Sequence, residues 1–381
     1  MRYARTLNLL QLLDKKSFFL FGPRSTGKTS LIEEQLGEKA TIVDLLNADT
    51  FIRLTNRPSE LEQIIEAGGQ KLVVIDEVQK LPVLLDEVHR LIEKKKICFL
   101  LTGSSARKLK HGGANMLGGR AWEARLFPLV TKEITDFDLD RYLQFGGLPQ
   151  VYTSALPSEE LNAYVNVYLK EEIQAEGLVR DVGRFTKFLH LASLSTGEVL
   201  NFSKLASDVG SAPSTVIEHF RILEDTLIGF FIEPWGRSKK RKEISTAKFY
   251  LFDTGVTNTL ARVKHLERNS NLYGRAFEQF IAMELRAALS YHRVPEELTF
   301  WRTYEKHEVD FVIGEQFAVE VKATVKSSDR DAKSLRLFAD ETSVPRLYLV
   351  SQDPIERVDG RLHFIHFEKF LKNLWDGKLF S

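Results

Sequence analysis

The first third of the chain contains short, almost continuous apolar runs. Residues 18–21, 72–75 and 97–101 lack the alternation of polar and apolar positions that a half-exposed strand has. Such runs are typical of strands buried on both faces of a parallel sheet. Residues 29–36 have the pattern of a helix start directly after the first run. The pattern therefore predicts an open α/β domain.

A helical pattern covers the middle of the chain. Residues 131–190 have apolar positions at helical spacing, which predicts a helical connecting region. A short helix is predicted to end at Gly210, and Ser214 is placed to cap the next helix. That second helix has one apolar stripe, made of Val216, Phe220, Leu223 and Leu227. Two helices joined by a short turn with a glycine predict a helix-turn-helix.

The last third changes pattern again. One helix and three strands are predicted, over residues 270–289, 298–314 and 317–324. Successive side chains of a strand point to opposite faces. Val319 and Val321 therefore share one face, and Glu320 and Lys322 share the other. An unpaired Glu and Lys gain nothing on a buried face, so the pair makes sense if that face is a metal site.

Composition narrows the class of protein. The 381 residues are 43% hydrophobic and 28% charged, which is ordinary for a globular protein of two or three domains. A net charge of +1 argues against a globally basic nucleic-acid binder but leaves room for a local basic patch. The lone Cys98 excludes an intramolecular disulfide and a cysteine-rich metal site, and it fits a reducing compartment.

Neither a membrane span nor a secretory signal is predicted. No stretch reaches the roughly 18 apolar residues that a membrane span needs. Residues 1–18 read as an amphipathic helix interrupted by charge, without the apolar core of a secretory signal. We therefore expect a cytoplasmic protein without membrane contact.

A glycine-rich turn separates the first apolar run from its helix. The sequence GPRSTGKT matches the G-x-x-x-x-G-K-[ST] pattern of a phosphate-binding loop, with a strand before it and a helix after it. Glycines let backbone N–H groups face phosphate oxygens, and the helix N-terminus adds positive potential. We expect Lys28 to reach the β- and γ-phosphates and Thr29 to ligate Mg²⁺. The expected nucleotide contacts are Gly22, Pro23, Arg24, Ser25, Thr26, Gly27, Lys28, Thr29 and Ser30.

Polar residues follow the next two apolar runs. Ligands of an open α/β sheet bind beyond the carboxyl ends of its strands. Asp76 and Glu77 end the second run, so we expect Asp76 to hold the Mg²⁺ and Glu77 to polarise the attacking water. Ser104 or Ser105, after the third run, is placed to contact the γ-phosphate or the water. Gly and Ser are also ordinary turn residues, so a plain turn is the alternative.

Arg120 follows two glycines, which allow the backbone to approach a ligand or a neighbour closely. Two interpretations stay open for this residue. It is either an arginine finger, supplied in cis or in trans, or a solvated loop arginine.

Four stretches within residues 17–130 together resemble an AAA-type P-loop ATPase: GPRSTGKTSLI, VVIDEVQKLP, LLTGSSARKL and LGGRAWEARLFPL. With FGGLPQVY at residues 145–152, they are similar to a prokaryotic ATPase family that carries a C-terminal domain of unknown function. The resemblance implies binding and hydrolysis of ATP. It indicates an ATPase domain over residues 1–135 and a helical connecting region over residues 136–190.

Basic residues crowd the tip of a predicted hairpin. Its strands, residues 229–235 and 248–253, would form a wing and give a winged helix over residues 191–260. A wing meets phosphates, whereas bases would be read from the second helix by Ser214, Thr215, Glu218 and His219. A solvated tip on a packing unit is the alternative. The basic cluster is Arg237, Lys239, Lys240, Arg241 and Lys242.

Four charged residues resemble the active-site set of the PD-(D/E)XK nuclease superfamily. They occur in the order helix, strand, strand, as Glu278 in GRAFE, Asp310 in EVDFVI, and Glu320 and Lys322 in AVEVKAT. The resemblance implies a nuclease-like α/β domain over residues 261–381. It implies Mg²⁺ or Mn²⁺ on Asp310 and Glu320, with Glu278 completing the shell and Lys322 orienting a water or stabilising the transition state. The alternative is a fold retained for DNA contact or docking, with Glu320 paired to Lys322.

These predictions combine into two hypotheses. One is an ATP-hydrolysing protein coupled to DNA binding or to metal-dependent cleavage of nucleic acid. The other is a nucleotide-switched regulator that binds DNA or protein and whose nuclease-like domain does not cut.

Overall fold

The computed structural model describes residues 3–105, 107, 117–169, 181–236 and 247–380. The chain forms two compact units. The N-terminal unit comprises residues 2–127 together with residues 225–228, and the C-terminal unit comprises residues 128–224 and 229–381. The basic cluster predicted at the hairpin tip, Arg237, Lys239, Lys240, Arg241 and Lys242, lies outside the described residues.

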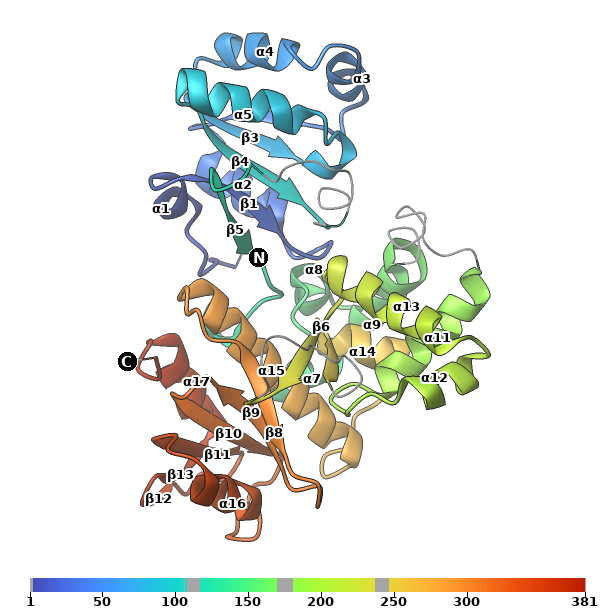
Figure 1. The fold of residues 1–381 in the computed structure, drawn as a ribbon, viewed down its shortest axis with the longest axis vertical. Helices are drawn as coiled ribbons and strands as arrows, with labels where there is room; N and C mark the ends of the chain where they lie inside the picture. Colours follow the sequence, from blue (N-terminus) through green and yellow to red (C-terminus); the bar gives the residue numbers. More distant parts are fainter. Residues whose placement is uncertain (1–2, 106, 108–116, 170–180, 237–246, 381) are drawn as a thin grey trace. The chain divides into compact units, whose positions relative to one another are not determined.

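A five-stranded sheet organises the N-terminal unit (Figure 1). All of its strands are parallel, in the order β2-β3-β4-β1-β5. The predicted apolar runs are its central strands, because helices cover both faces. The strands are β1 (Ser17–Phe21), β2 (Thr41–Asp44), β3 (Leu72–Asp76), β4 (Cys98–Gly103) and β5 (Ala121–Arg125).

Helices α3, α4 and α5 cover one face of this sheet, and α1 and α2 lie on the other (Figure 1). Apolar side chains of α3–α5 pack with Phe19, Phe21 and Ile75 of the strands. The amphipathic helix predicted over residues 1–18 is much shorter than expected. The helices are α1 (Leu9–Leu13), α2 (Lys28–Leu36), α3 (Ala48–Asn56), α4 (Glu60–Gly68) and α5 (Leu84–Lys95).

The C-terminal unit begins with the predicted helical region. In its described part, helices are joined by short turns and irregular segments, in agreement with the apolar spacing. The buried Asp253 joins this region to α14, because its carboxylate accepts hydrogen bonds from the backbone N–H groups of Gly147 and Val256. The helices are α7 (Leu139–Phe145), α8 (Pro149–Thr153), α9 (Pro157–Ala163), the π-helical η3 (Tyr164–Leu169), α11 (Val182–Leu194) and α14 (Thr254–Leu260).

The predicted pair of helices is present as α12 (Phe202–Val209) and α13 (Pro213–Asp225). Gly210 ends α12 with a left-handed φ of 76°, which a glycine adopts without strain. Helix α13 begins one residue before Ser214, so the prediction that Ser214 caps it is wrong. His219 is buried against the rings of Phe185 and Phe188, which rules out its expected role in reading bases.

Strands β6 (Gly229–Pro234) and β7 (Lys248–Leu251) form the predicted antiparallel pair. Strand β6 also pairs in parallel with β8 (Leu298–Arg302). The expected wing strands therefore extend the C-terminal sheet, whose order is β12-β13-β11-β10-β9-β8-β6-β7. Its other strands are β9 (Glu308–Ile313), β10 (Phe317–Lys322), β11 (Arg346–Ser351), β12 (Arg357–Asp359) and β13 (Leu362–His366).

Three helices complete the C-terminal unit (Figure 1). Helix α16 (Lys333–Glu341) buries Leu335 and Phe338 against the sheet. Helices α15 (Asn271–Tyr291) and α17 (Phe367–Trp375) meet through aromatic rings, with the centroids of Phe277 and Phe367 5.7 Å apart.

Among the described residues, no helix combines the length and the apolar character that crossing a membrane requires.

Candidate nucleotide site and a charged cluster in the C-terminal unit

The predicted phosphate-binding loop leaves β1 at Phe21 and enters α2 at Lys28. Glycine is needed at both ends of this loop. Gly27 has a φ of 93°, which strains any residue with a side chain. A Cβ atom at Gly22 would lie 2.6 Å from the carbonyl oxygen of Leu126, and that oxygen is fixed in the backbone. The loop therefore has its shape because these two positions carry no side chain.

Lys28 points into the loop. Its ammonium donates hydrogen bonds to the carbonyl oxygens of Gly22 at 2.6 Å and Pro23 at 3.2 Å. The hydroxyl of Thr26 also donates to the Pro23 carbonyl oxygen, at 2.8 Å. The loop is thus held closed around a positive charge at the N-terminus of α2, which is the electrostatic setting that binds phosphate. Arg24, Ser25, Thr29 and Ser30 are exposed on the same loop and first helical turn.

The structure brings Asp76 to this loop. In the sheet order, β3 and β1 flank β4. Because these strands are parallel, their carboxyl ends lie at the same end of the sheet. The Thr29 hydroxyl lies 3.4 Å from one carboxylate oxygen of Asp76, and the Thr102 hydroxyl donates to the other. A hydroxyl and a carboxylate at this distance are oxygen donors of the kind that Mg²⁺ prefers. These two residues therefore fit the predicted ion.

Glu77 has a left-handed backbone, with φ 59°. Its N–H donates to the Thr102 hydroxyl oxygen at 3.1 Å. Its carboxylate accepts a hydrogen bond from Gln79, and the same amide nitrogen lies 3.3 Å from the Ser104 hydroxyl. Glu77 and Ser104 are therefore linked through Gln79.

Thr102 and Gln79 were missing from the predicted site. Thr102 had one sequence signal, because it is a polar residue within the last positions of an otherwise apolar strand. Gln79 had none, since its role depends on the distance between two strand ends. Each connects side chains that the sequence did identify.

Ser105 connects the end of β4 to residues 225–228, which belong to the same compact unit. Its hydroxyl lies 3.3 Å from the carbonyl oxygen of Asp225. Arg107 makes an ion pair with the Asp225 carboxylate at 2.7 Å, and the arginine side chain is only 10% exposed. Leu227 is buried in the core of the N-terminal unit. The last residue of α13 is thus fixed to the loop that carries Ser104.

Arg120 lies at the wrong end of the sheet to act in cis. Ala121 pairs with Ser17, the first residue of β1, whereas Arg125 pairs with Phe21 beside the loop. Five residues of strand separate the two ends by about 15 Å. The interpretation of Arg120 as a finger for its own nucleotide is therefore wrong, and the guanidinium pairs with Glu93 instead. Arg125, at the other end of β5, is the arginine that lies beside the phosphate-binding loop.

The four residues of the predicted C-terminal site also come together. Lys322 pairs with Glu320 at 2.6 Å, and Asp310 accepts the Val321 N–H at 2.8 Å. Burial is the largest influence on Glu320 and raises its pKa to about 7, although Lys322 acts in the opposite direction. Burial likewise raises the pKa of Asp310 well above its usual range, and Glu320 adds to the shift.

A lysine that the sequence did not single out lies among these carboxylates. The ammonium of Lys248, in β7, is 3.4 Å from Glu278 and 3.8 Å from Asp310. Within the described part of the chain, no three acidic, histidine or cysteine side chains are grouped so as to hold a metal ion. The arrangement therefore does not fit the Mg²⁺ or Mn²⁺ predicted on Glu278, Asp310 and Glu320.

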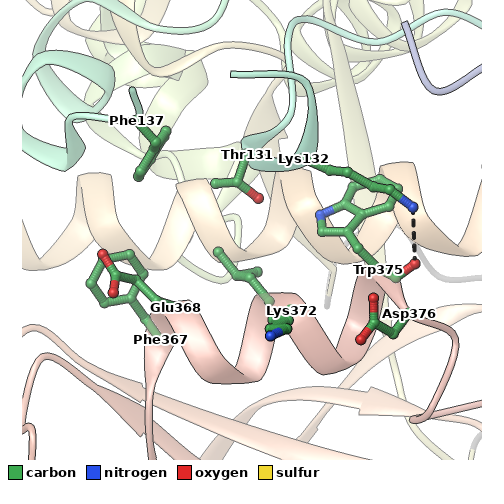
Figure 2. Close-up of a pocket in the computed structure, with 9 residues that line it drawn as sticks. Thr131, Lys132, Phe137, Phe367, Glu368, Lys372, Trp375 and Asp376 are labelled. Carbon is green, nitrogen blue, oxygen red and sulfur yellow. Dashed lines mark hydrogen bonds between the residues drawn. The ribbon is translucent and has the colours of Figure 1, made fainter. Parts of the chain in front are cut away.

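A cavity of about 310 Å³ lies beside α17 in the C-terminal unit (Figure 2). Phe137, Phe367 and Trp375 give it apolar walls, and Figure 2 shows Lys132 reaching the Trp375 carbonyl oxygen, at 3.4 Å. The buried Glu284 contacts two of the lining residues, because it accepts hydrogen bonds from Thr131 and from the Trp375 indole. Burial raises the pKa of Glu284 to about 7 despite these donors.

Comparison with known proteins agrees with the geometry of the loop. Residues 14–135 match a family model described as an AAA domain, and the chain therefore contains a P-loop AAA domain. Residues 136–267 and 273–370 match two models that are each described as a domain of unknown function, DUF8612 and DUF4143. The match at residues 273–370 agrees with the expected C-terminal domain of unknown function.

Two similar proteins are each described as an uncharacterized protein. One from Mycobacterium tuberculosis is 25% identical over 87% of this chain and 75% of its own length. One from Methanocaldococcus jannaschii is 23% identical over 94% of this chain and 85% of its own. A solved structure of the replication initiator DnaA, bound to AMPPCP and single-stranded DNA, covers 56% of this chain and 85% of its own at 14% identity. Its TM-score of 0.30 is too low to bear on function.

Proposed function

We propose that the protein hydrolyses ATP and that its nucleotide state controls a contact between DNA and the α12–α13 segment. The ATPase proposal depends on one observation: the Asp76 carboxylate contacts the hydroxyls of Thr29 and Thr102 beside the phosphate-binding loop. These residues come from three separate segments of the AAA domain, and the sheet order places them at one edge.

Each residue has a role in this proposal. The Lys28 ammonium and the N–H groups at the start of α2 bind the phosphate oxygens. Thr29 and Asp76 would hold Mg²⁺, which, when bound, neutralises charge on the β- and γ-phosphates. Glu77 orients the attacking water, and Gln79 keeps its carboxylate directed toward Ser104. Ser104 is placed at the strand end, where it can respond to the γ-phosphate.

The ATPase proposal is tested with a matched pair of lysine variants. Lys28→Ala is expected to abolish steady-state ATP turnover, because it removes the charge inside the loop. The control, Lys80→Ala, removes an exposed lysine next to the same strand end and should leave turnover unchanged. An unaltered rate in Lys28→Ala would remove this residue from the mechanism.

Two features support DNA as the controlled partner. The first turns of α13 expose Ser214, Thr215 and Glu218, as a helix that enters a groove must do. The last residue of α13, Asp225, is fixed by Arg107 to the loop that carries Ser104. A movement of Ser104 on nucleotide hydrolysis can therefore be transmitted to α13 along the backbone to Arg107 and through the Arg107–Asp225 ion pair.

This coupling is tested by measuring duplex DNA affinity with and without a non-hydrolysable ATP analogue. We expect the affinity to depend on nucleotide and to fall with rising salt, because phosphate contacts release counterions. Arg107→Ala should keep the DNA contact but lose its nucleotide dependence. DNA affinity that is absent at low salt would instead favour a protein partner.

Cleavage of nucleic acid is not part of this proposal. Asp310, Glu320 and Lys322 lie together, but the carboxylates of the described cluster surround ammonium groups rather than a shared ion position. We therefore favour a nuclease-like domain that does not cut. Incubation of plasmid and single-stranded DNA with Mg²⁺ or Mn²⁺, with and without ATP, tests this. Cutting by the wild type that Glu320→Ala abolishes would contradict it.

A further inference from the structure

The side chain of Lys248 is 2% exposed, yet it ends in an ammonium group. A buried charge is tolerated when it is paired and hydrogen-bonded. Glu308 provides the closest carboxylate, at 2.5 Å, and Glu278 and Asp310 lie 3.4 Å and 3.8 Å away. These acids come from α15 and β9, so three acids from two elements converge on a single lysine.

The same acids are also held by other donors. Glu278 accepts a hydrogen bond from the Tyr250 hydroxyl, and Asp310 accepts one from the Val321 N–H at 2.8 Å. Arg302 lies 3.5 Å from Glu308. Their oxygens are therefore directed toward fixed donors around Lys248, and the ammonium is at the centre of the arrangement.

Glu320 lies in β10, which pairs with the strand that carries Asp310, and its relative exposure is 5%. One of its oxygens pairs with Lys322, whereas the other is buried and has no hydrogen-bond partner among the described residues. A buried acceptor without a donor is rare in native proteins. That oxygen is a ligand position that the present arrangement of cations does not use.

We propose that Lys248 is the resident cation of this cluster and that its ammonium excludes a divalent ion. Divalent ions bind carboxylate oxygens at about 2.0–2.6 Å. An ion at that distance from Glu278 and Asp310 would compete with the ammonium for the same oxygens and would be repelled by it. The inference rests on the proposed non-cleaving, nuclease-like domain and supplies its physical cause. The acids of the described cluster are not grouped around an ion position while the ammonium is present. Removing the Lys248 charge should let Glu278, Asp310 and Glu320 close around a divalent ion.

The test is a titration of the full-length, nucleotide-free protein with Mn²⁺, in which electron paramagnetic resonance reports the free ion. The wild type is expected to show no Mn²⁺ binding that depends on Glu320. Lys248→Met should bind one Mn²⁺ ion more than the wild type, and adding Glu320→Gln to it should remove that ion. Lys322→Met is the matched control, because it removes an equal charge that is 37% exposed and pairs with one acid.

A second variant covers the case in which Lys248→Met does not fold. The double variant Lys248→Met with Glu308→Gln removes one charge of each sign, so the net charge of the cluster stays that of the wild type, and neutral replacement of a buried ion pair is often tolerated well. It should also gain the Mn²⁺ ion. Wild-type binding that Glu320→Gln abolishes, equal gains in Lys248→Met and Lys322→Met, or no gain in either Lys248 variant would each overturn the inference. DNA affinity with and without nucleotide is measured separately, so failure of the proposed function would be recognised independently.

Discussion

Thr102 offers a sharp test of how the nucleotide site is built. Its hydroxyl donates to Asp76 and accepts the N–H of Glu77. Replacing it in Thr102→Val keeps the shape of the side chain but removes both hydrogen bonds. Thr102 is completely buried, so water does not replace the two polar contacts that the variant loses.

The magnitude follows from the two lost bonds. A hydrogen bond to a charged group contributes about 1.5–3 kcal/mol, and a buried N–H without an acceptor costs about 1–3 kcal/mol. We therefore expect the free energy of unfolding of Thr102→Val to fall by about 3 kcal/mol. Asp76 and Glu77 also lose their common support. If only about 1.4 kcal/mol of that loss reaches the transition state, kcat for ATP falls about tenfold.

Thr41→Val is the matched control for this experiment. Thr41 lies in β2 of the same sheet, and its hydroxyl oxygen is buried without a hydrogen-bond partner among the described residues. Its replacement should leave kcat unchanged and should not lower stability. Urea unfolding and steady-state ATPase rates measure both quantities. Equal behaviour of Thr102→Val and Thr41→Val would refute the role assigned to Thr102.

Three further predictions follow from the structure. Gly22→Ala should weaken ATP binding at least tenfold in calorimetry, because its Cβ would lie 2.6 Å from the Leu126 carbonyl oxygen; unchanged affinity would contradict the need for glycine at this end of the loop. Arg125→Ala should lower kcat, because Arg125 pairs with Phe21 at the end of β5 beside the phosphate-binding loop, whereas Arg120→Ala, at the opposite end of β5, should not; the reverse order would contradict the strand register. The pKa of Glu284 is about 7 when folded and ordinarily 4.5, so the folded state holds the extra proton and stability falls as pH rises between these values. Glu284→Gln should flatten that slope in unfolding experiments, and an unaltered slope would count against the shift.

Much of the N-terminal unit is encoded locally. The buried strands follow from continuous apolar runs, and the phosphate-binding loop follows from glycines at positions that exclude a side chain, Gly22 and Gly27. Asp76 could be predicted because it stands at the carboxyl end of a buried parallel strand, and ligands of an open α/β sheet bind beyond that end. In the C-terminal unit, strand alternation was enough to pair Glu320 with Lys322.

Contacts between distant segments were decided by the tertiary structure. Strand register placed Arg120 away from the loop and Arg125 beside it, although only five positions separate them in the sequence. The position of β7 at the edge of the C-terminal sheet brought Lys248 into an acidic cluster, which no local pattern indicates. Spacing along the chain fixes which side chains share a face of one element. Which elements become neighbours depends on sheet order and packing, and these determine the partner that a buried charge finds.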